Sequence, residues 1–318
     1  MRAEVSAAVV SFNTKELTLR CLEATQRAAT CCKMVFTLAD NGSTDGTVEA
    51  VRRYHPDWRI VLQPENPGYG AALNRAFKSA PGRFYLALNS DVVLHPDALR
   101  HLCDFLDRCS KCGLVGPALT YPDGRLQLSA KRFPSLAFAV GEILWLHTFF
   151  PHSRWIRRFY YMDLDTPWVD TVSGSAMLIR GDAFERVGGF DEGFRMYFEE
   201  TDFCLRLQRA GFSVALCPQA KAVHRHGAST IQTSARQVDY YLSYIRFFRK
   251  HHGRSESFIL VAVVALSTVI RMAGLAVKYP PFSRRQGAVL RSKLAACLRL
   301  LGSLSWSVNG APTTEARQ

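Results

Sequence analysis

The chain has 318 residues, of which 48% are hydrophobic and 21% are charged, and these ordinary globular values exclude bulk disorder. This length is enough for one large hydrophobic core, or for one core with an appendage. Lys and Arg number 40 against 27 Asp and Glu, so the chain is strongly basic, with a formal net charge of +13.

The cysteines indicate a reducing compartment. All nine are scattered along the chain, and some of them, such as Cys21 and Cys204, fall in segments predicted to be buried. Cys109 and Cys112 form a lone CxxC without a second pair of ligands, which makes a zinc or redox role the weaker interpretation. A strand is predicted from Val5 onward with no basic and apolar leader before it, so we expect a cytoplasmic protein.

The first 120 residues alternate apolar strand patterns with helical patterns. Strands are predicted at 5–11, 33–39, 59–62, 84–88 and 114–119, and helices at 15–29, 44–54, 69–79 and 96–108. This alternation is typical of a mostly parallel sheet with helices on both faces, so we predict an α/β fold. Gly68-Tyr69-Gly70 opens a helix but lacks the third glycine of a dinucleotide fingerprint, and the sequence contains no Walker loop.

Residues 120–168 interrupt the alternation and form a predicted insertion. A short strand is expected at 127–133, and an apolar, aromatic stretch follows at 137–150. A surface that receives a ligand and a helical hairpin packed on the core explain this pattern equally well. Regular structure is expected again at 169–172 and 176–179.

The basic excess is concentrated in the C-terminal part of the chain. Eleven basic residues and one acidic residue lie from 246 to 299, which accounts for +10 of the net charge of +13. The same part contains 14 uncharged residues at 257–270 and then an apolar stripe from 290 to 301 that is typical of an amphipathic helix. Fourteen residues are too few for a hydrocarbon core, and Arg271 follows them, so we expect this tail to lie on an anionic membrane surface.

Two other interpretations of the tail stay open. A core helix with a solvated basic face would have the same composition, and nucleic-acid binding is the weakest alternative because no nucleic-acid motif accompanies the basic residues. We therefore expect no nucleic-acid partner. The expected organisation is an α/β domain at residues 1–245, which includes the insertion, and a helical tail at 246–318.

Acidic side chains and one histidine follow predicted strands or open a predicted helix. They are Asp40, Asp91, Glu199, Glu200, Asp202 and His224. Ligands of an open α/β sheet bind at the carboxyl ends of its strands, so we expect these side chains to face one cleft. Carboxylates gathered in a cleft repel one another unless a cation or a proton lies between them, so the set suits one divalent metal and one general base.

Several motifs occur in a fixed order between residues 5 and 230. The first half contains Val9-Val10-Ser11-Phe12-Asn13, Asp40-Asn41-Gly42-Ser43-Thr44-Asp45-Gly46-Thr47, Asn66-Pro67-Gly68-Tyr69-Gly70, Asn74 and Asn89-Ser90-Asp91. The second half contains Val169-Asp170, Ser173-Gly174-Ser175, Gly188-Gly189-Phe190-Asp191-Glu192, Met196-Tyr197-Phe198-Glu199-Glu200-Thr201-Asp202 and His224. In this order they resemble the family 2 glycosyltransferases with the GT-A fold, most closely bacterial rhamnosyltransferase-like members that build cell-wall or surface polysaccharide.

The resemblance implies a donor site. Asp40 corresponds to the acid that hydrogen-bonds the pyrimidine base, and Asn74 to a polar residue that faces the nucleotide. The nucleotide-sugar site is expected to comprise Ser11, Asn13, Asp40, Asn74, Asn89, Ser90 and Gly174.

The resemblance also implies a metal site. Asn89-Ser90-Asp91 stands where the family has an Asp-x-Asp motif, so Asp91 is the expected direct ligand of Mg²⁺ or Mn²⁺, and His224 matches a later histidine ligand. Such a cation would neutralise the charge that builds on the leaving diphosphate. Taken alone, Asp91 would be interpreted as a helix cap and His224 as a surface histidine.

Glu199-Glu200-Thr201-Asp202 aligns with a Glu-Asp-x-Asp motif whose second acid is the catalytic base. Glu200 holds that position, where glutamate adds one methylene of reach, and Glu199 is expected to orient the loop or to assist the base. Asp202 is four residues from Arg206, so we expect a structural ion pair between them.

The expected enzyme is an inverting hexosyltransferase on the inner face of the plasma membrane. Its donor would be a dTDP- or UDP-linked sugar, with rhamnose favoured by the motif style, and its acceptor a saccharide or a polyprenyl-linked saccharide beside the insertion at 120–168. A sugar-1-phosphate nucleotidyltransferase is an alternative, but its glycine-rich loop is absent after Val10. A membrane-bound scaffold with a decayed site is favoured by Asn89 and Glu200, and opposed by the intact Asp40, Asp91 and His224.

Overall fold

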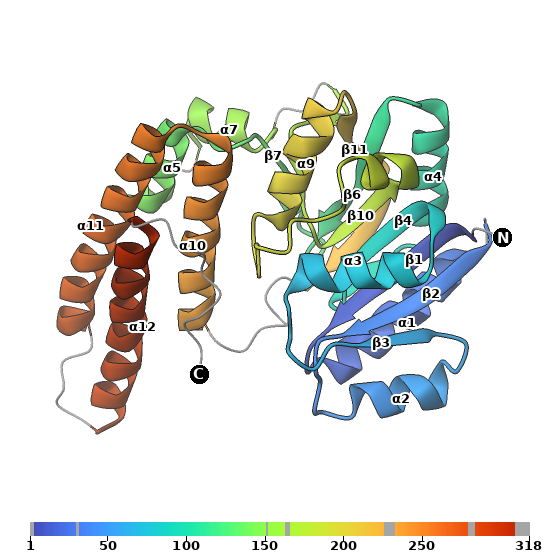
Figure 1. Ribbon diagram of the computed structural model, residues 1–318, viewed down its shortest axis with the longest axis horizontal. Coiled ribbons are helices and arrows are strands. Elements are labelled where there is room, and N and C mark those ends of the chain that lie inside the picture. Colours follow the sequence, from blue (N-terminus) through green and yellow to red (C-terminus); the bar gives the residue numbers. More distant parts are fainter. Residues whose placement is uncertain are drawn as a thin grey trace. The chain divides into compact units, whose positions relative to one another are not determined.

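The computed structural model describes residues 3–29, 32–150, 152–162, 166–225, 233–278 and 284–308, and divides the chain into two compact units. The first, the α/β unit, comprises residues 1–133 and 153–231, and the second, the helical unit, comprises 134–152 and 232–318 (Figure 1). This division differs from the one expected from the sequence. The helical unit begins at 232 instead of 246, and it includes the apolar stretch that we had placed in the insertion of the α/β domain.

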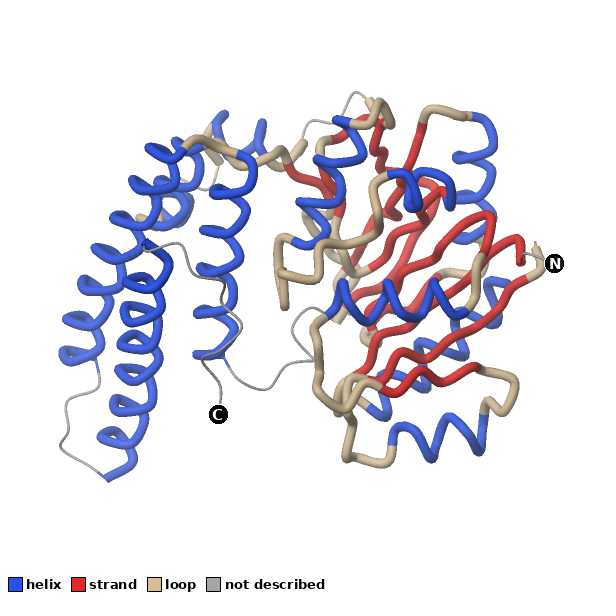
Figure 2. The backbone as a smooth tube through the Cα atoms, in the orientation of Figure 1, coloured by secondary structure: helices blue, strands red, loops and turns tan. Residues whose placement is uncertain are grey.

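An open sheet forms the centre of the α/β unit (Figure 2). Its strands are β1 (Ala3–Ser11), β2 (Met34–Asp40), β3 (Arg59–Leu62), β4 (Gly82–Asn89), β5 (Val92–Leu94), β6 (Cys112–Thr120), β8 (Trp168–Val169), β10 (Ala176–Arg180) and β11 (Ser213–His224). The order is β3-β2-β1-β4-β10-β6-β11-β5, and β8 also pairs with β11. Neighbours among β3, β2, β1 and β4 are parallel, as are β6 and β11, whereas β10 runs antiparallel between β4 and β6. A separate ribbon joins β7 (Ala130–Lys131) to β9 (Thr171–Val172).

Helices cover both faces of the sheet, as the sequence pattern predicted. They are α1 (Lys15–Ala28), α2 (Thr47–Tyr54), α3 (Tyr69–Ser79), α4 (Ala98–Arg108), α8 (Gly181–Arg186) and α9 (Glu199–Arg209). The short helix α7 (Arg154–Phe159) belongs to the same unit. Alternate residues of β4 supply the two cores, because successive side chains of a strand point to opposite faces. Phe84 and Leu86 pack with α1 and α4, whereas Tyr85 and Ala87 pack with α3, α8 and α9.

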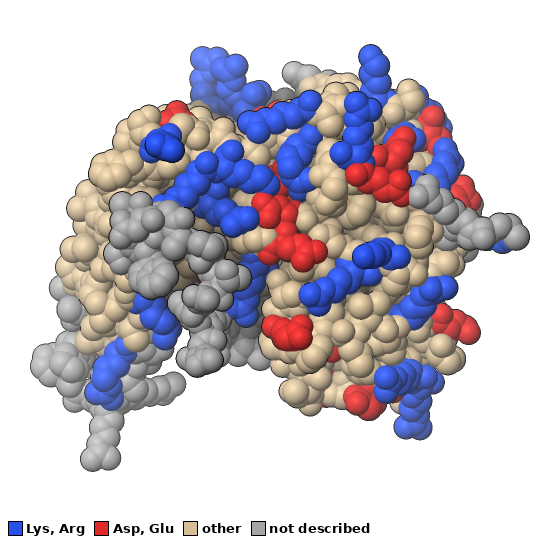
Figure 3. Space-filling model, viewed as in Figure 1, with Lys and Arg blue, Asp and Glu red and all other residues tan. Residues whose placement is uncertain are grey.

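The helical unit consists of α5 (Leu136–Ile143), α6 (Leu146–Phe149), α10 (Thr233–His251), α11 (Arg254–Lys278) and α12 (Arg284–Val308). Its last three helices pack against one another, and α5 packs on α11. Phe247, Phe248 and Val264 are fully buried between them. Most of the described surface over this unit in Figure 3 is uncharged, and its charged side chains are mostly Lys and Arg.

Helix α11 is apolar on two faces. One face, with Leu260 and Val264, is buried in the unit, while Phe258, Leu266 and Ile270 on another face are at least half exposed. Within the described part of the chain, 254–275 is the one helical segment that passes for a membrane span by length and composition, with a hydropathy of 2.3. The helix is therefore longer than the 14-residue run apparent in the sequence.

Candidate active site

The sheet register brings the predicted site residues to one edge. Ser11 at the end of β1 pairs with Asp40 at the end of β2, and the preceding residue of β1 pairs with Asn89 at the end of β4. His224 pairs with Val92 across β11 and β5, which places it beside Asp91. Parallel strands end at the same edge of a sheet, so these side chains gather there although they are far apart in the sequence.

Carboxylate oxygens without a hydrogen-bond partner distinguish this edge. Among the buried side-chain atoms of the described residues, four such oxygens lack a partner, and they belong to Asp40, Asp91 and Glu199. Buried carboxylate oxygens are costly unless a donor, a proton or a cation satisfies them. All three acids were predicted to be functional, so the unsatisfied oxygens mark the edge as a ligand site.

Asp40 is positioned by the turn that follows β2. Its Oδ1 accepts hydrogen bonds from the backbone N–H groups of Gly42 at 3.1 Å and Ser43 at 2.8 Å. The other oxygen, Oδ2, is buried and has no protein donor among the described residues. This oxygen can accept an N–H from a bound molecule.

The predicted donor-site residues on β1 and before Asp91 have structural contacts. The Ser11 hydroxyl lies 2.8 Å from the Thr18 hydroxyl, and the Ser90 hydroxyl lies 2.9 Å from the Thr14 hydroxyl, inside one buried network. Asn13 accepts the Thr44 N–H at 2.7 Å. These contacts tie the strand ends to α1 and to the Asp40 turn. The side chains therefore support the site through contacts with other protein groups.

Asn74 is engaged on both sides of its amide. Its Oδ1 accepts the Phe190 N–H at 2.9 Å, and its Nδ2 donates to the Phe190 carbonyl at 2.9 Å and to Glu192 at 3.0 Å. These bonds fix the turn before α9. They use both ends of the Asn74 amide, which makes the expected nucleotide contact less favourable. Asn89 is half-buried, and its backbone N–H donates to the Ser175 carbonyl.

Asp91 and His224 form the pair predicted to hold a metal. The His224 Nε2 lies 3.4 Å from the Asp91 Oδ1, and both side chains are buried. Gln127 fixes the imidazole: its Nε2 donates to the His224 carbonyl at 2.6 Å, and its Oε1 lies 2.9 Å from Nδ1. With the amide so oriented, Nδ1 carries the proton in the neutral ring, and the lone pair of Nε2 faces the carboxylate.

Two lone-pair donors at this distance fit a shared cation. Imidazole and carboxylate groups are both ligands of divalent metals, and the Asp91 oxygens have no protein donor among the described residues. Within the same residues no group of three or more His, Cys, Asp and Glu side chains could enclose an ion. Water and substrate oxygens are the usual further ligands of Mg²⁺ at phosphate sites.

Glu199 and Glu200 begin α9 after two residues, Tyr197 and Phe198, with φ values of 67° and 65°. Left-handed backbone is rare outside glycine and is often found at functional sites. Gly174 lies against the second acid, because a Cβ added to it would meet the Glu200 Cβ at 3.3 Å. The tight turn thus places the Glu199 and Glu200 carboxylates next to each other, with Gly174 packed against Glu200.

The two acids are in different electrostatic environments. Burial, and then the charge of Glu200, raise the pKa of Glu199 to about 8. Glu200 lies 3.3 Å from the Lys131 Nζ and accepts the Thr201 hydroxyl hydrogen bond at 2.9 Å. Near neutral pH the proton therefore belongs on Glu199, and Glu200 is the acid that contacts the Lys131 ammonium.

Sequence reasoning missed three side chains of this edge: Gln127, Lys131 and Tyr69. Tyr69 donates its hydroxyl proton to the Gly174 carbonyl at 2.6 Å, and burial raises its pKa well above the usual range, with nearby Glu199 adding to the shift. Gln127 and Lys131 lie in the segment that we predicted as a strand, but nothing in that pattern distinguished them from surface polar residues.

Two smaller expectations are also answered. The Arg206 Nε lies 2.7 Å from the Asp202 Oδ2, so the predicted ion pair is confirmed, and Asp202 is fully buried. Cys109 and Cys112 are thiols and form no disulfide with each other.

Comparisons with known proteins agree with this geometry. The sequence matches the model of glycosyl transferase family 2 over residues 6–188. The chain belongs to that family. It is 33% identical over 231 residues to N-acetylglucosaminyl-diphospho-decaprenol L-rhamnosyltransferase of Mycobacterium tuberculosis, which covers 68% of this chain and 75% of that protein. It is 31% identical over 158 residues to the rhamnosyltransferase WbbL of Escherichia coli, which covers 48% of this chain and 56% of that protein.

Solved structures show the same fold. The mannosyltransferase PcManGT from Pyrobaculum calidifontis, in complex with GDP-Man and Mn²⁺, superposes with a TM-score of 0.58 at 19% identity, covering 97% of this chain and 86% of that chain. TarS from S. aureus with UDP-GlcNAc gives a TM-score of 0.55 at 17% identity, covering 95% and 80% of the two chains. The family 2 chain is thus a rhamnosyltransferase-like glycosyltransferase with the GT-A fold.

Proposed function

We propose that this glycosyltransferase transfers a sugar, rhamnose foremost, from a nucleotide-diphosphate donor to a polyprenyl-linked saccharide in cell-surface polysaccharide synthesis. The observation that carries the proposal is the set of unsatisfied buried carboxylate oxygens on Asp40, Asp91 and Glu199. Asp40 would contact the nucleobase and Asp91 would serve the diphosphate, whereas Glu199 lies next to Glu200, the proposed general base. The sugar and the acceptor are suggested by the names of the mycobacterial and Escherichia coli relatives.

The nucleotide base would be held by Asp40. Its unsatisfied Oδ2 accepts a hydrogen bond, so it favours a base that presents a ring N–H. Thymine and uracil have such an N–H, whereas the corresponding ring nitrogen of cytosine is an acceptor. Guanine also has a ring N–H, so this chemistry fits a dTDP-, UDP- or GDP-linked donor, and the rhamnosyltransferase relatives favour the dTDP-linked one.

The donor diphosphate would lie at Asp91 and His224. A divalent cation held by these two residues would neutralise charge on the leaving diphosphate. Gln127 keeps the His224 lone pair directed at Asp91, and the buried network of Ser90 and Thr14 keeps the Asp91 backbone in place. These residues act before the chemistry, by fixing where the diphosphate binds.

Glu200 would be the general base. The acceptor hydroxyl oxygen forms a bond to the anomeric carbon as the bond from that carbon to the diphosphate breaks, and the hydroxyl proton moves to Glu200. Attack from the side opposite the leaving group inverts the configuration. Lys131 stabilises the anionic form of Glu200, while Glu199 keeps a proton and so adds no second charge.

The enzyme would act at the inner face of the plasma membrane. The exposed apolar face of α11 and the basic excess of 246–299 together suit an anionic bilayer surface. A polyprenyl-linked acceptor would be reached from there.

A panel of donors and acceptors tests the proposal. The full chain is incubated with dTDP-rhamnose, UDP-hexoses and GDP-mannose, each with a polyprenyl-diphosphate-linked N-acetylglucosamine or a water-soluble saccharide, with Mn²⁺ or with chelator. We expect rhamnosyl transfer to the lipid-linked acceptor with Mn²⁺ and no transfer with chelator. Transfer from another donor would overturn the rhamnose assignment, and inactivity with every pair would favour the decayed scaffold.

A further inference from the structure

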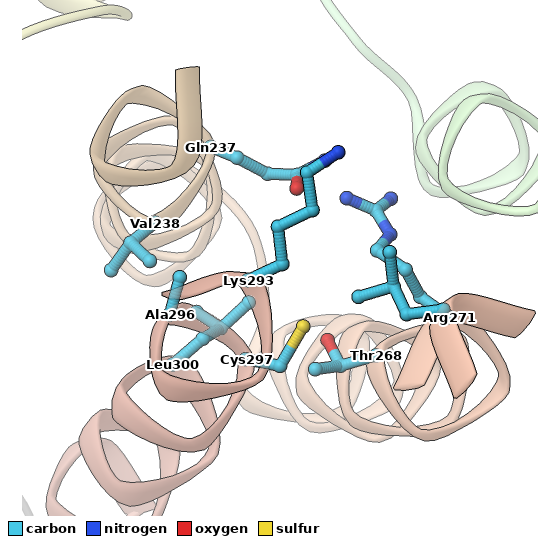
Figure 4. Close-up of a pocket in the computed structure, with 9 residues that line it drawn as sticks. Gln237, Val238, Thr268, Arg271, Lys293, Ala296, Cys297 and Leu300 are labelled. Atoms are coloured by element: carbon cyan, nitrogen blue, oxygen red, sulfur yellow. The ribbon is translucent and has the colours of Figure 1, made fainter. Parts of the chain in front are cut away.

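A cavity of about 250 Å³ lies between α10, α11 and α12 of the helical unit (Figure 4). We call it the three-helix pocket. Gln237 on α10, Arg271 on α11 and Lys293 on α12 line it, and Figure 4 shows their polar ends turned toward one another. Thr268 and Cys297 also line the pocket and lie below these polar ends in the view of Figure 4.

The pocket has a basic side. Arg271 and Lys293 are among its lining residues, and no acidic residue is among those that line it in the described part of the chain. Both side chains present positively charged N–H donors, which are the groups that bind oxyanions in proteins. The charge of the pocket therefore points to an anionic ligand.

Arg271 is held in place by aromatic side chains. Its Nη2 donates to the Tyr241 hydroxyl at 3.1 Å, and its guanidinium lies 5.1 Å from the centre of the Trp145 ring. The Tyr241 bond uses one of the five N–H donors of the guanidinium. A guanidinium that is fixed in this way loses little entropy when it binds a planar or tetrahedral oxyanion.

The other side of the pocket is apolar. Val238, Leu275, Ala296 and Leu300 line it from the three helices. Small anions such as inorganic phosphate have no apolar part to contact these residues. The pocket volume is also below the usual range for drug-sized ligands. A phosphate joined to a hydrocarbon chain has both the charge and the apolar part that the pocket offers.

We propose that the three-helix pocket binds the phosphate group of an anionic membrane phospholipid, with the start of its apolar part against Leu275 and Leu300. The exposed apolar face of α11, which includes Leu266 and Ile270, lies on the same helix as Arg271. A bilayer that meets this face would therefore present its phosphates close to the pocket. This specific lipid site rests on the membrane location proposed above, where the basic tail and the apolar face of α11 attract the protein to an anionic bilayer.

Soluble short-chain lipids test the pocket separately from the membrane surface. Binding of dihexanoyl-phosphatidylglycerol to the full chain is measured by calorimetry below its critical micelle concentration, with dihexanoyl-phosphatidylcholine and inorganic phosphate as comparison ligands. We expect saturable binding of the anionic lipid, and weaker binding of both comparison ligands.

Three variants locate the site. Lys293→Gln removes a charge inside the pocket, Ala296→Leu fills the pocket without changing charge, and Arg299→Gln removes an exposed charge from the same helix. The first should weaken lipid binding at least about tenfold, the usual effect of one charge-assisted hydrogen bond, and Ala296→Leu should also weaken it. Arg299→Gln should leave the affinity unchanged, and the melting temperature of each variant checks that it is folded.

Several results would overturn the pocket. Equal losses in Lys293→Gln and Arg299→Gln would mean diffuse attraction by the basic tail, and equal affinity for inorganic phosphate would mean a site for a free anion. Binding to anionic vesicles without any binding of the short-chain lipid would leave the membrane location intact and remove the pocket from it.

Discussion

Two adjacent glutamates have different surroundings, and the roles proposed for them differ accordingly. Glu200 is paired with Lys131, whereas the buried Glu199 has an unsatisfied oxygen and a pKa raised to about 8 by burial and by its neighbour's charge. Sequence alignment selected Glu200 as the base, and the contacts supply a physical reason for that choice. The Lys131 contact was not predictable, because it depends on how β7 packs beside α9.

Replacing Glu200 tests its role as base. Glu200→Gln keeps the shape of the side chain but removes its basicity, so turnover should fall roughly 10²- to 10⁴-fold while donor affinity stays the same. Steady-state kinetics and donor titration measure the two effects. Asp202→Asn is the control, since loss of one partner from its buried ion pair should cost about 3 kcal/mol of stability with little effect on the chemistry. Retained turnover in Glu200→Gln would remove it from the mechanism.

Glu199 should affect stability in a pH-dependent way. Its folded pKa of about 8 exceeds the ordinary 4.5, so between these values the folded state keeps a proton that the unfolded state has lost. The stability of the parent protein therefore decreases, from this group, as pH rises through that window. Glu199→Gln has no such proton, so its unfolding free energy relative to the parent should increase from pH 5 to pH 8 and then level off. Urea titrations at several pH values would show a flat difference if the pKa is not raised.

At the scale of elements, most of the sheet was predictable and most of the tertiary placement was not. The helix at Tyr69–Ser79 and the strand at Arg59–Leu62 have the bounds that the sequence predicted, because strong apolar periodicity and flanking glycine or proline define them. The stretch at 134–152 was misplaced, since an apolar helix shows that it must be buried but not against which partner. The role of Gln127 was not predicted either, because it depends on the tertiary contact with His224 at the end of β11.

The start of α3 is coupled to the segment that leads into α9. Gly68 has a φ of +103°, and a Cβ there would lie 2.2 Å from the Arg195 carbonyl oxygen. Gly68→Ala should therefore displace the turn before Glu199 and reduce both stability and turnover. Gly124→Ala is the matched control, because Gly124 has a φ of +84° with no atom within 4 Å, so it adds backbone strain of about 1 kcal/mol alone. Equal effects of the two substitutions in thermal melts and activity assays would refute the coupling.

At the scale of the whole molecule, the exposed apolar face of α11 is expected to bind a bilayer. Leu266→Glu and Ile270→Glu each place a negative charge on this face, so sedimentation with phosphatidylglycerol vesicles should decrease sharply. Leu62→Glu introduces the same charge at an exposed position on β3 and should leave sedimentation unchanged. High salt should weaken the binding of the parent protein, because part of the attraction is screened charge. Unchanged sedimentation of the α11 variants would make this face a packing surface.

Binding of the donor diphosphate is the most direct test of the central claim that Asp91 and His224 hold a cation for the donor. Calorimetric titration of dTDP into the full chain should show binding in Mn²⁺ and a large loss in chelator. Asp91→Asn, which keeps the size of the side chain, should bind dTDP in Mn²⁺ as weakly as the parent does in chelator, and Asp202→Asn should bind normally. Tight dTDP binding that is indifferent to both chelator and Asp91→Asn would contradict the account.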